Sequence, residues 1–190
     1  MNEKNLILAV DVGTTETKAV LVSPDGYIDS RQSTCCLCYP DKSCVEQSPA
    51  EISDAIYQSS RAVLAAHPDL ISKLAGLVFT SQMQNTVPVD REGKPLMNML
   101  SWMDERAASF TQEDMFRGWI KIEGYPVSKL LKFMRITGGM PGKTGKDTVC
   151  KLAWMKKNKP DLYASVHKFL DAKDYAVFLA TGNYVTSHDM

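Results

Sequence analysis

Short hydrophobic runs near the N-terminus alternate with polar turns. Residues 6–10 form an apolar run of strand length, and a second run at 17–22 follows a short polar-rich segment. Pro24-Asp25-Gly26 is a turn signal, and residues 27–37 are typical of a third strand. Three strands joined by tight turns predict an antiparallel meander.

The next segment has the periodicity of an amphipathic helix. Ser48 suits the N-cap, Pro49 the first helical position and Glu51 the reciprocal position of a capping box. His67-Pro68 should end this helix. Residues 74–81 then form a continuous apolar run, which predicts a strand covered on both faces.

The rest of the chain predicts a hairpin followed by helices. The hairpin spans residues 86–97 with a turn at 91–93, and the sequence beyond Trp102 is mostly helical in pattern. Helix breaks are expected at Gly124 and 138–142, and two further helices at 148–158 and 171–180. No internal repeat or linker interrupts the pattern, so we expect residues 1–190 to form one domain.

Composition narrows the class of protein. The chain has 190 residues, 44% hydrophobic and 23% charged, with no formal net charge. It lacks both the ~20-residue apolar run of a membrane span and a signal-peptide pattern, which predicts a soluble cytoplasmic protein.

The charges are unevenly distributed along the chain. Residues 1–117 carry 10 basic and 16 acidic side chains, and residues 118–190 carry 12 basic and 6 acidic ones. We interpret the basic half as solvated helix positions rather than a nucleic-acid surface, because no stacking aromatics are interleaved with it.

Four of the five cysteines fall within ten residues, at Cys35, Cys36, Cys38 and Cys44. Structural zinc ligands usually form two separated pairs or include histidines, and this spacing does neither. An odd number of cysteines without an export signal favours free thiols in a reducing compartment. The role of the cluster is left open.

The turn between the first two strands is the first candidate for chemistry. Gly13 would let a phosphate approach the backbone, Thr14 and Thr15 add hydroxyl donors, and Lys18 adds positive charge. Asp11, at the end of the first strand, is placed to hold a hydrated Mg²⁺ beside those phosphates. An ordinary hairpin, in which Gly and Thr serve only the turn, is the alternative.

Two more polar segments follow buried-looking strands. Gln82 and Gln84 could hydrogen-bond the hydroxyls of a polyol, and Met83 could contact its carbon side. Trp102-x-Asp104-x-Arg106 could present a sugar with a stacking wall and a charged hydrogen-bonding pair. The same residues can be explained without a ligand: the glutamine amides would hydrogen-bond only the loop backbone, and Asp104 would be an ordinary helix cap.

Taken in order, these motifs resemble the N-terminal domain of the FGGY family of carbohydrate kinases, and its xylulokinase-like branch in particular. The earlier matches are Asp11-Val12-Gly13-Thr14-Thr15-x-x-Lys18, Val45-Glu46-Gln47-Ser48-Pro49, Ser81-Gln82-Met83 and Trp102-x-Asp104-x-Arg106. The later ones are Lys151-Leu152-x-Trp154, Asn158-x-Pro160, Lys173-Asp174-Tyr175 and Thr181-Gly182. Each match is weak alone, and the ordered set spans nearly the whole chain.

The resemblance implies an α/β fold of the ribonuclease-H/actin type: a mixed sheet, antiparallel in its first three strands, with flanking helices. It implies ATP-dependent phosphorylation of a sugar or polyol, with ATP and Mg²⁺ as cofactors. Asp11 would serve the metal–phosphate centre, while Gly13, Thr14, Thr15 and Lys18 would bind phosphate. Substrate contacts would come from Gln82, Met83, Gln84, Trp102, Asp104 and Arg106.

The resemblance also implies a second, C-terminal domain that binds the nucleotide and carries the general base, an Asp. This chain does not reach that residue, so we expect it to be inactive alone. Its expected partners are that domain and a small sugar or polyol, with neither nucleic acid nor membrane involved. A homodimer is left open.

Two departures from known patterns limit the substrate assignment. His then Gly usually follow the Gln-Met pair, but Gln84 and Asn85 stand here. The Arg-Glu expected of a glycerol kinase is also missing. D-Xylulose is the leading substrate, with ribulose, gluconate, erythritol and glycerol as alternatives. A non-catalytic sugar-binding relative and an actin- or chaperone-like ATPase are the competing classes.

Overall fold

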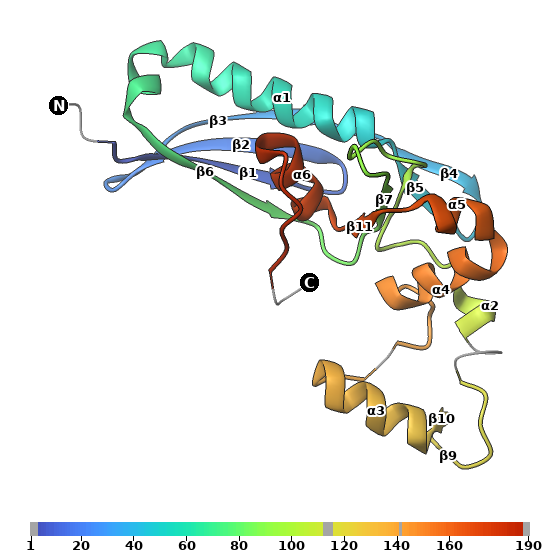
Figure 1. The fold of residues 1–190 in the computed structure, drawn as a ribbon. Helices are drawn as coiled ribbons and strands as arrows, with labels where there is room; N and C mark the ends of the chain where they lie inside the picture. The colour runs from blue at the N-terminus through green and yellow to red at the C-terminus, as the bar shows by residue number, and fades with distance from the viewer. Residues whose placement is uncertain (1–3, 112–115, 141, 188–190) are drawn as a thin grey trace.

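The structure is a computed structural model that describes residues 4–111, 116–140 and 142–187. It is a mixed α/β arrangement of small sheets with flanking helices (Figure 1). The strands are β1 (Leu6–Val12), β2 (Glu16–Ser23), β3 (Gly26–Thr34), β4 (Leu37–Asp41), β5 (Cys44–Gln47), β6 (Leu74–Ser81), β7 (Val87–Val89), β8 (Met99–Leu100), β9 (Lys121–Ile122), β10 (Tyr125–Pro126) and β11 (Lys168–Leu170). The helices are α1 (Pro49–Ala66), η1 (Pro68–Lys73), α2 (Ala108–Phe110), α3 (Val127–Thr137), α4 (Thr148–Asn158), α5 (Pro160–Ser165) and α6 (Ala172–Thr181).

The main sheet has the strand order β3-β2-β1-β6. The first three strands pair antiparallel and β6 runs parallel to β1, which confirms the meander and the mixed sheet. Alternate residues of β1 are buried, including Leu8, Val10 and Val12. Because side chains alternate across a strand, Asp11 lies on the opposite face of the sheet.

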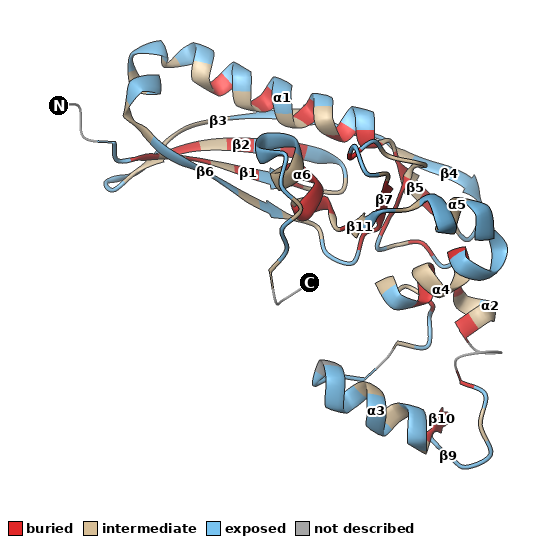
Figure 2. Ribbon diagram, viewed as in Figure 1, coloured by how far each residue is buried: buried red, intermediate tan, exposed pale blue. Residues whose placement is uncertain are grey.

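Helix α1 covers one face of this sheet, and its buried stripe faces the strands (Figure 2). As predicted, the helix begins after Ser48, whose hydroxyl accepts a hydrogen bond from the Glu51 amide, and it ends before His67. The Glu51 carboxylate accepts instead from the backbone N–H of Cys36 at 3.2 Å. Glu51 therefore ties α1 to the segment before β4 instead of forming the reciprocal bond of a capping box.

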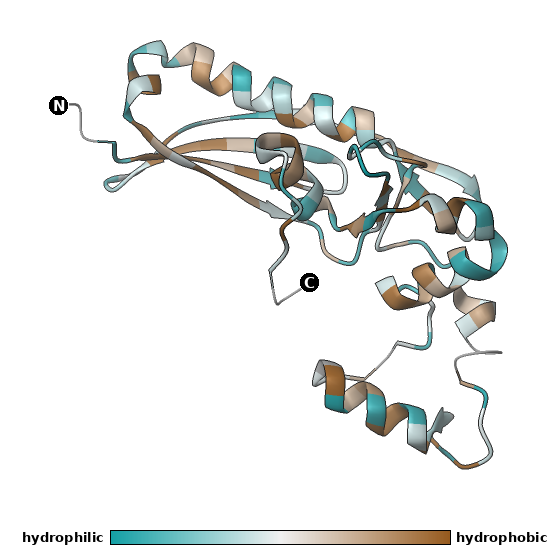
Figure 3. Cartoon of the chain, viewed as in Figure 1, coloured by the Kyte–Doolittle hydropathy of each residue, from teal (hydrophilic) through white to brown (hydrophobic). Residues whose placement is uncertain are grey.

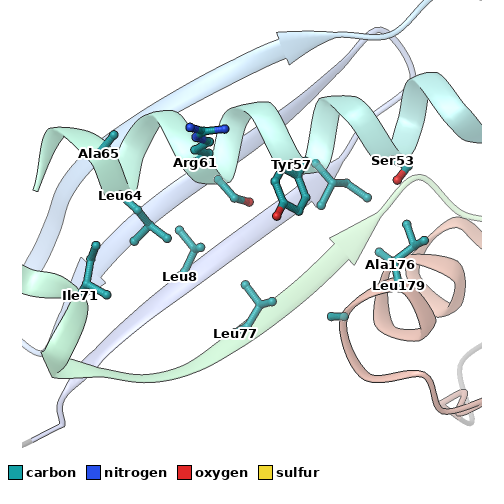
Figure 4. Close-up of a pocket in the computed structure, with 13 residues that line it drawn as sticks. Leu8, Ser53, Tyr57, Arg61, Leu64, Ala65, Ile71, Leu77, Ala176 and Leu179 are labelled. Atoms are coloured by element: carbon teal, nitrogen blue, oxygen red, sulfur yellow. The ribbon is translucent and has the colours of Figure 1, made fainter. Parts of the chain in front are cut away.

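Strand β6 differs from its prediction. It is strongly apolar (Figure 3), yet it lies at the edge of the main sheet, and Leu77 and Val78 are 44% and 53% exposed. An apolar groove of about 710 Å³ runs between α1, β6 and α6, and Leu8, Leu64 and Leu77 point into it (Figure 4). The prediction of a strand covered on both faces is thus wrong for the described residues.

The second half of the chain builds the layer beside this sheet. The predicted hairpin at 86–97 is confirmed: Val89 and Pro95 are antiparallel bridge partners, and the Leu96 amide donates to the Pro88 carbonyl oxygen. Its first strand, β7, also pairs antiparallel with β11, which is distant in sequence, and β8 pairs with β5. Helix α4 has the predicted bounds, and α6 begins one residue later than predicted because Asp171 is its N-cap.

The segment around Gly124 was expected to be helical up to a break at that residue. Instead Gly124, with φ +84°, lies in the turn of the small hairpin β9–β10, which leads into α3. Helix α3 lies away from the main sheet (Figure 1), and Leu131 and Ile136 are exposed. Within the described part of the chain, no helix has the length and apolar composition needed to cross a bilayer.

Candidate functional site

The tip of the β1–β2 hairpin, residues 13–15, begins with a glycine that the turn requires. The Gly13 amide donates to the carbonyl oxygen of Glu16 at 3.0 Å. A Cβ at this position would lie 2.7 Å from that oxygen, closer than real Cβ contacts. Gly13 is therefore fixed by the turn itself, whatever else its small size permits.

The carbonyl oxygens of Gly13, Thr14 and Thr15 all point toward the body of the protein. They accept hydrogen bonds from Gln82 Nε2 (3.2 Å), Gln47 Nε2 (2.9 Å) and the Cys35 backbone N–H (3.0 Å), respectively. In a trans peptide the N–H points opposite to the C=O, so the amides of Thr14 and Thr15 face outward. Successive outward amides form a concavity suited to an anion.

A network of side-chain hydrogen bonds holds this hairpin. Gln82 accepts from the Thr14 hydroxyl at 3.0 Å and donates to Gln47 Oε1 at 2.6 Å. The Trp102 indole N–H donates to the same Thr14 hydroxyl at 3.1 Å. The network joins residues from the hairpin, β5, the segment after β6 and the segment after β8. It fixes the hairpin tip relative to Trp102.

A hollow of about 500 Å³ lies beside the hairpin tip. Its lining residues are Thr14, Ser81, Gln82, Met83, Gln84 and Trp102. Met83 and Trp102 are 58% and 40% exposed, so an apolar side chain and an aromatic ring face solvent beside amides and hydroxyls. This is a surface on which a polyhydroxylated molecule could both hydrogen-bond and stack.

Asp11 and Lys18 are cross-strand neighbours on the face of the sheet opposite α1. They are register partners in the β1–β2 pair, Asp11 also pairs with Thr80 of β6, and both charged side chains are exposed. Neither is among the residues that line the hollow. They lie at the end of the strands that leads into the hairpin tip.

Asp104 and Arg106 lie apart from the hollow, in an internal ion-pair cluster. Asp104 is fully buried and accepts from the Val45 amide at 2.8 Å and from the Arg106 guanidinium. Arg106 also donates to Glu46 Oε1 at 2.6 Å and lies over the Trp154 ring. Burial alone would lower the pKa of Arg106, but its hydrogen bonds to Asp104 and Glu46 raise it overall, so the group stays charged. These contacts hold the segment that carries Trp102 against β5.

The possible metal ligands near the hairpin suit a Mg²⁺ ion that binds together with phosphates better than they suit a permanently bound metal. Mg²⁺ keeps several waters and is usually bound through one or two carboxylates plus phosphate oxygens. Asp11 offers one exposed carboxylate beside the hairpin. Among the described residues, no three histidine, cysteine or acidic side chains group closely enough to hold a metal themselves.

Three buried polar residues that the sequence did not single out as site residues support the site. Gln47 bonds the hairpin, Asn85 accepts from the Trp102 amide at 3.2 Å, and Lys151 bonds two backbone carbonyls. A polar residue at an inward position of an alternating strand is the signal that marks Gln47. Asn85 and Lys151 have no such signal, because their partners come from distant segments.

The fold and site together define a class of protein: an α/β domain with an actin-like sheet, whose first hairpin lies beside an amide-lined hollow. Residues 6–190 match the model of the N-terminal domain of the FGGY family of carbohydrate kinases, and the chain belongs to this family.

Known proteins with different substrates are about equally similar to the chain. It is 28% identical over 97% of its length to a gluconokinase from Bacillus licheniformis, and 27% identical over 95% to a xylulose kinase from Staphylococcus xylosus. A glycerol kinase from Thermococcus gammatolerans is 28% identical over 96%. The crystal structure of a xyloylose kinase from Brucella ovis superposes on 94% of the chain with a TM-score of 0.80 at 27% identity. The chain spans about a third of each relative, 33%, 35%, 35% and 34% in turn.

Proposed function

We propose that this chain supplies the phosphate-binding hairpin and the sugar-binding wall of an ATP-dependent carbohydrate kinase. The observation that carries the proposal is the pair of hydrogen bonds that join Gln82, Thr14 and Trp102. They support the proposal because they hold the hairpin tip, which would bind the anion, beside a hollow lined with amides and an aromatic ring. Phosphoryl transfer depends mainly on such positioning and on charge neutralisation.

Each residue then has a defined task. The Thr14 and Thr15 amides and Lys18 would bind the transferring phosphate, and Asp11 would hold water ligands of Mg²⁺. Bound Mg²⁺–ATP supplies the activated phosphoryl group. Gln82 and Gln84 would orient the acceptor hydroxyls, with Trp102 beneath the carbon chain. None of the residues that line the hollow carries a carboxylate or imidazole, so the base that accepts the hydroxyl proton would come from a second, nucleotide-binding domain.

We propose an open-chain ketose or sugar acid as substrate, with D-xylulose first. The exposed side chains of Met83 and Gln84 line the hollow where they would contact the substrate and distinguish the arrangement of its hydroxyl groups. Gluconate is the second candidate, because a gluconokinase is as similar to the chain as a xylulose kinase is. A site whose polar groups stay unpaired with the wrong ligand can discriminate strongly.

The substrate proposal is tested by titrating the chain with D-xylulose, D-gluconate and glycerol. Tryptophan labelled with fluorine at position 5 gives separate ¹⁹F signals for the three tryptophans, and Trp102→Phe assigns one of them. We expect a saturable shift of the Trp102 signal with one ligand and no change at Trp119. If none of the three ligands causes a saturable shift of the Trp102 signal, the proposal is contradicted.

The role of Asp11 is tested where this chain is joined to a nucleotide-binding domain. Asp11→Ala should abolish turnover, because the carboxylate beside the phosphates is removed, while the exposed position leaves stability within about 0.5 kcal/mol. Asp25→Ala, an exposed turn aspartate on the same sheet, is the matched control and should leave turnover unchanged. Near-wild-type turnover of Asp11→Ala would exclude this role.

A non-catalytic sugar-binding protein is the second candidate function. It would use the same hollow, but it would need neither Asp11 nor Lys18. Both are present, exposed and adjacent across the β1–β2 pair, which favours the kinase.

A further inference from the structure

Lys151 on α4 is fully buried, although it carries a charged group at the end of a long side chain. Removing an ammonium group from water is unfavourable unless hydrogen bonds and opposite charges compensate. Its location in the fold therefore requires an explanation. The phosphate hairpin and the hollow do not include it among their residues.

The Lys151 ammonium joins the two segments that form the walls of the hollow. Its Nζ donates to the backbone carbonyl of Gln84 at 2.7 Å and to that of Ser101 at 2.7 Å. Gln84 follows β6 and lines the hollow, and Ser101 directly precedes Trp102. One nitrogen atom thus holds both carbonyl oxygens close together.

The first of these contacts acts on an unusual backbone. Gln84 has φ +62°, a left-handed conformation that side chains other than glycine rarely adopt. Such conformations persist where surrounding contacts determine them. Lys151 bonds the carbonyl of Gln84, and on the other side the Asn85 amide donates to Asp171 Oδ2 at 3.0 Å. Both contacts hold the peptide group that follows Gln84, so the left-handed residue keeps its side chain exposed in the hollow.

The charges around Lys151 come from three other positions. Asp104 follows β8, Asp171 is the N-cap of α6 and Asp147 is the N-cap of α4, and all three attract the ammonium, as does neighbouring Cys150. Burial nevertheless lowers the pKa of Lys151 to about 8. The group is therefore mostly charged at neutral pH.

We propose that Lys151 is a positioning residue that sets the spacing of the two walls of the hollow and, through Gln84 and Trp102, its selectivity among acceptors. This inference rests on the proposed sugar-kinase function. Lys151 would not touch the substrate, because its side chain is fully buried and two of its three N–H donors bind backbone carbonyls. A lysine that only filled space would be replaceable by methionine without any effect on the walls.

The test compares Lys151→Met with Lys156→Met, which makes the same change at an exposed position of α4. The amides of Asn85 and Trp102 are hydrogen-bonded in the two walls, so their hydrogen exchange reports wall order. We expect Lys151→Met to speed both at least tenfold while Val10 in β1 stays within twofold. The ratio of D-xylulose to D-gluconate affinity should shift at least fivefold toward equality. Lys156→Met should change neither quantity.

A wild-type measurement keeps the inference falsifiable should Lys151→Met fail to fold. In ¹³C-labelled protein, the carbonyl resonances of Gln84 and Ser101 should titrate together with Lys151 Nζ at one shared midpoint. Carbonyl resonances that do not follow Nζ, or a folded Lys151→Met with unchanged exchange and selectivity, would overturn the positioning role. A wild type that binds none of the tested sugars would contradict the proposed function instead.

Discussion

At the scale of the residue, Gln84 combines a strained backbone with an exposed side chain, so stability and binding can be separated. Gln84→Gly removes the side chain and relieves a left-handed conformation that disfavours other residues by about 1–3 kcal/mol. We expect the free energy of unfolding to stay level or rise by up to about 1 kcal/mol, while affinity for the preferred sugar falls at least tenfold. Urea unfolding and sugar titration measure the two effects.

Gln84→Ala is the matched control. It removes the same side chain but keeps the backbone strain, so it should lose the same affinity without the gain in stability. Equal sugar affinity in all three proteins would show that the Gln84 side chain has no part in binding.

The buried Lys151 predicts a specific dependence of stability on pH. Burial lowers its folded-state pKa from 10.5 to about 8. Between these values the unfolded chain holds a proton that the folded chain has released, so the Lys151 contribution to the free energy of unfolding rises with pH across this window. Burial raises the pKa of the Cys35 and Cys150 thiols, which contribute with the opposite sign at alkaline pH. Urea unfolding at several pH values should therefore show a more positive slope in the wild type and in Lys156→Met than in Lys151→Met. The same slope in all three would contradict the assignment.

Only part of the site could be predicted from the sequence. Thr14, Gln82, Met83, Gln84 and Trp102 lie close to strand ends, and the structure brings all five to one hollow. The ion pair of Asp104 and Arg106 turns inward, because its third member, Glu46, comes from a distant strand. Such partnerships depend on tertiary packing, which local spacing does not specify.

At the scale of the element, the β1–β2 hairpin depends on Gly13. Gly13→Ala places a Cβ against the carbonyl oxygen of Glu16, and the turn must open to relieve this contact. We expect a loss of about 1–3 kcal/mol in the free energy of unfolding and slower phosphate binding, measured by urea unfolding and by ³¹P NMR with tripolyphosphate.

Gly76→Ala in β6 is the control for this change. Its Cβ would meet only Ile7 Cδ1, at an ordinary 3.8 Å, so stability should stay level or increase. A stability loss as large as that of Gly13→Ala would mean that the hairpin contact is not the cause.

The secondary-structure predictions agree with the structure where local sequence signals determine an element. The cap residues and helical spacing of α1 predicted that helix, and α4 has the bounds expected for it. The prediction for β6 failed because local composition does not specify a strand's neighbours. The apolar run of β6 looks the same at the edge of a sheet as at its centre, and the additional pairing of β7 with the distant β11 has no local signal either.

At the scale of the whole molecule, the chain holds an acceptor hollow whose lining includes no proton acceptor of carboxylate or imidazole type. We therefore expect the 190-residue chain to release no ADP from Mg²⁺–ATP in a sugar-dependent way, even where sugar binds. A coupled ADP assay with D-xylulose and D-gluconate measures this. Sugar-dependent turnover by the chain alone would show that a catalytic base lies within it.

The shared hydroxyl of Thr14 has a further consequence. It accepts from the Trp102 indole and donates to Gln82, which also binds the carbonyl of Gly13. A ligand that displaces the indole ring therefore alters the hydrogen bonding of the turn that we propose binds phosphate. Thermodynamic linkage then requires that sugar change the affinity for phosphate by the same factor as phosphate changes the affinity for sugar. Such coupling would favour transfer to the intended hydroxyl over loss of the phosphoryl group to water.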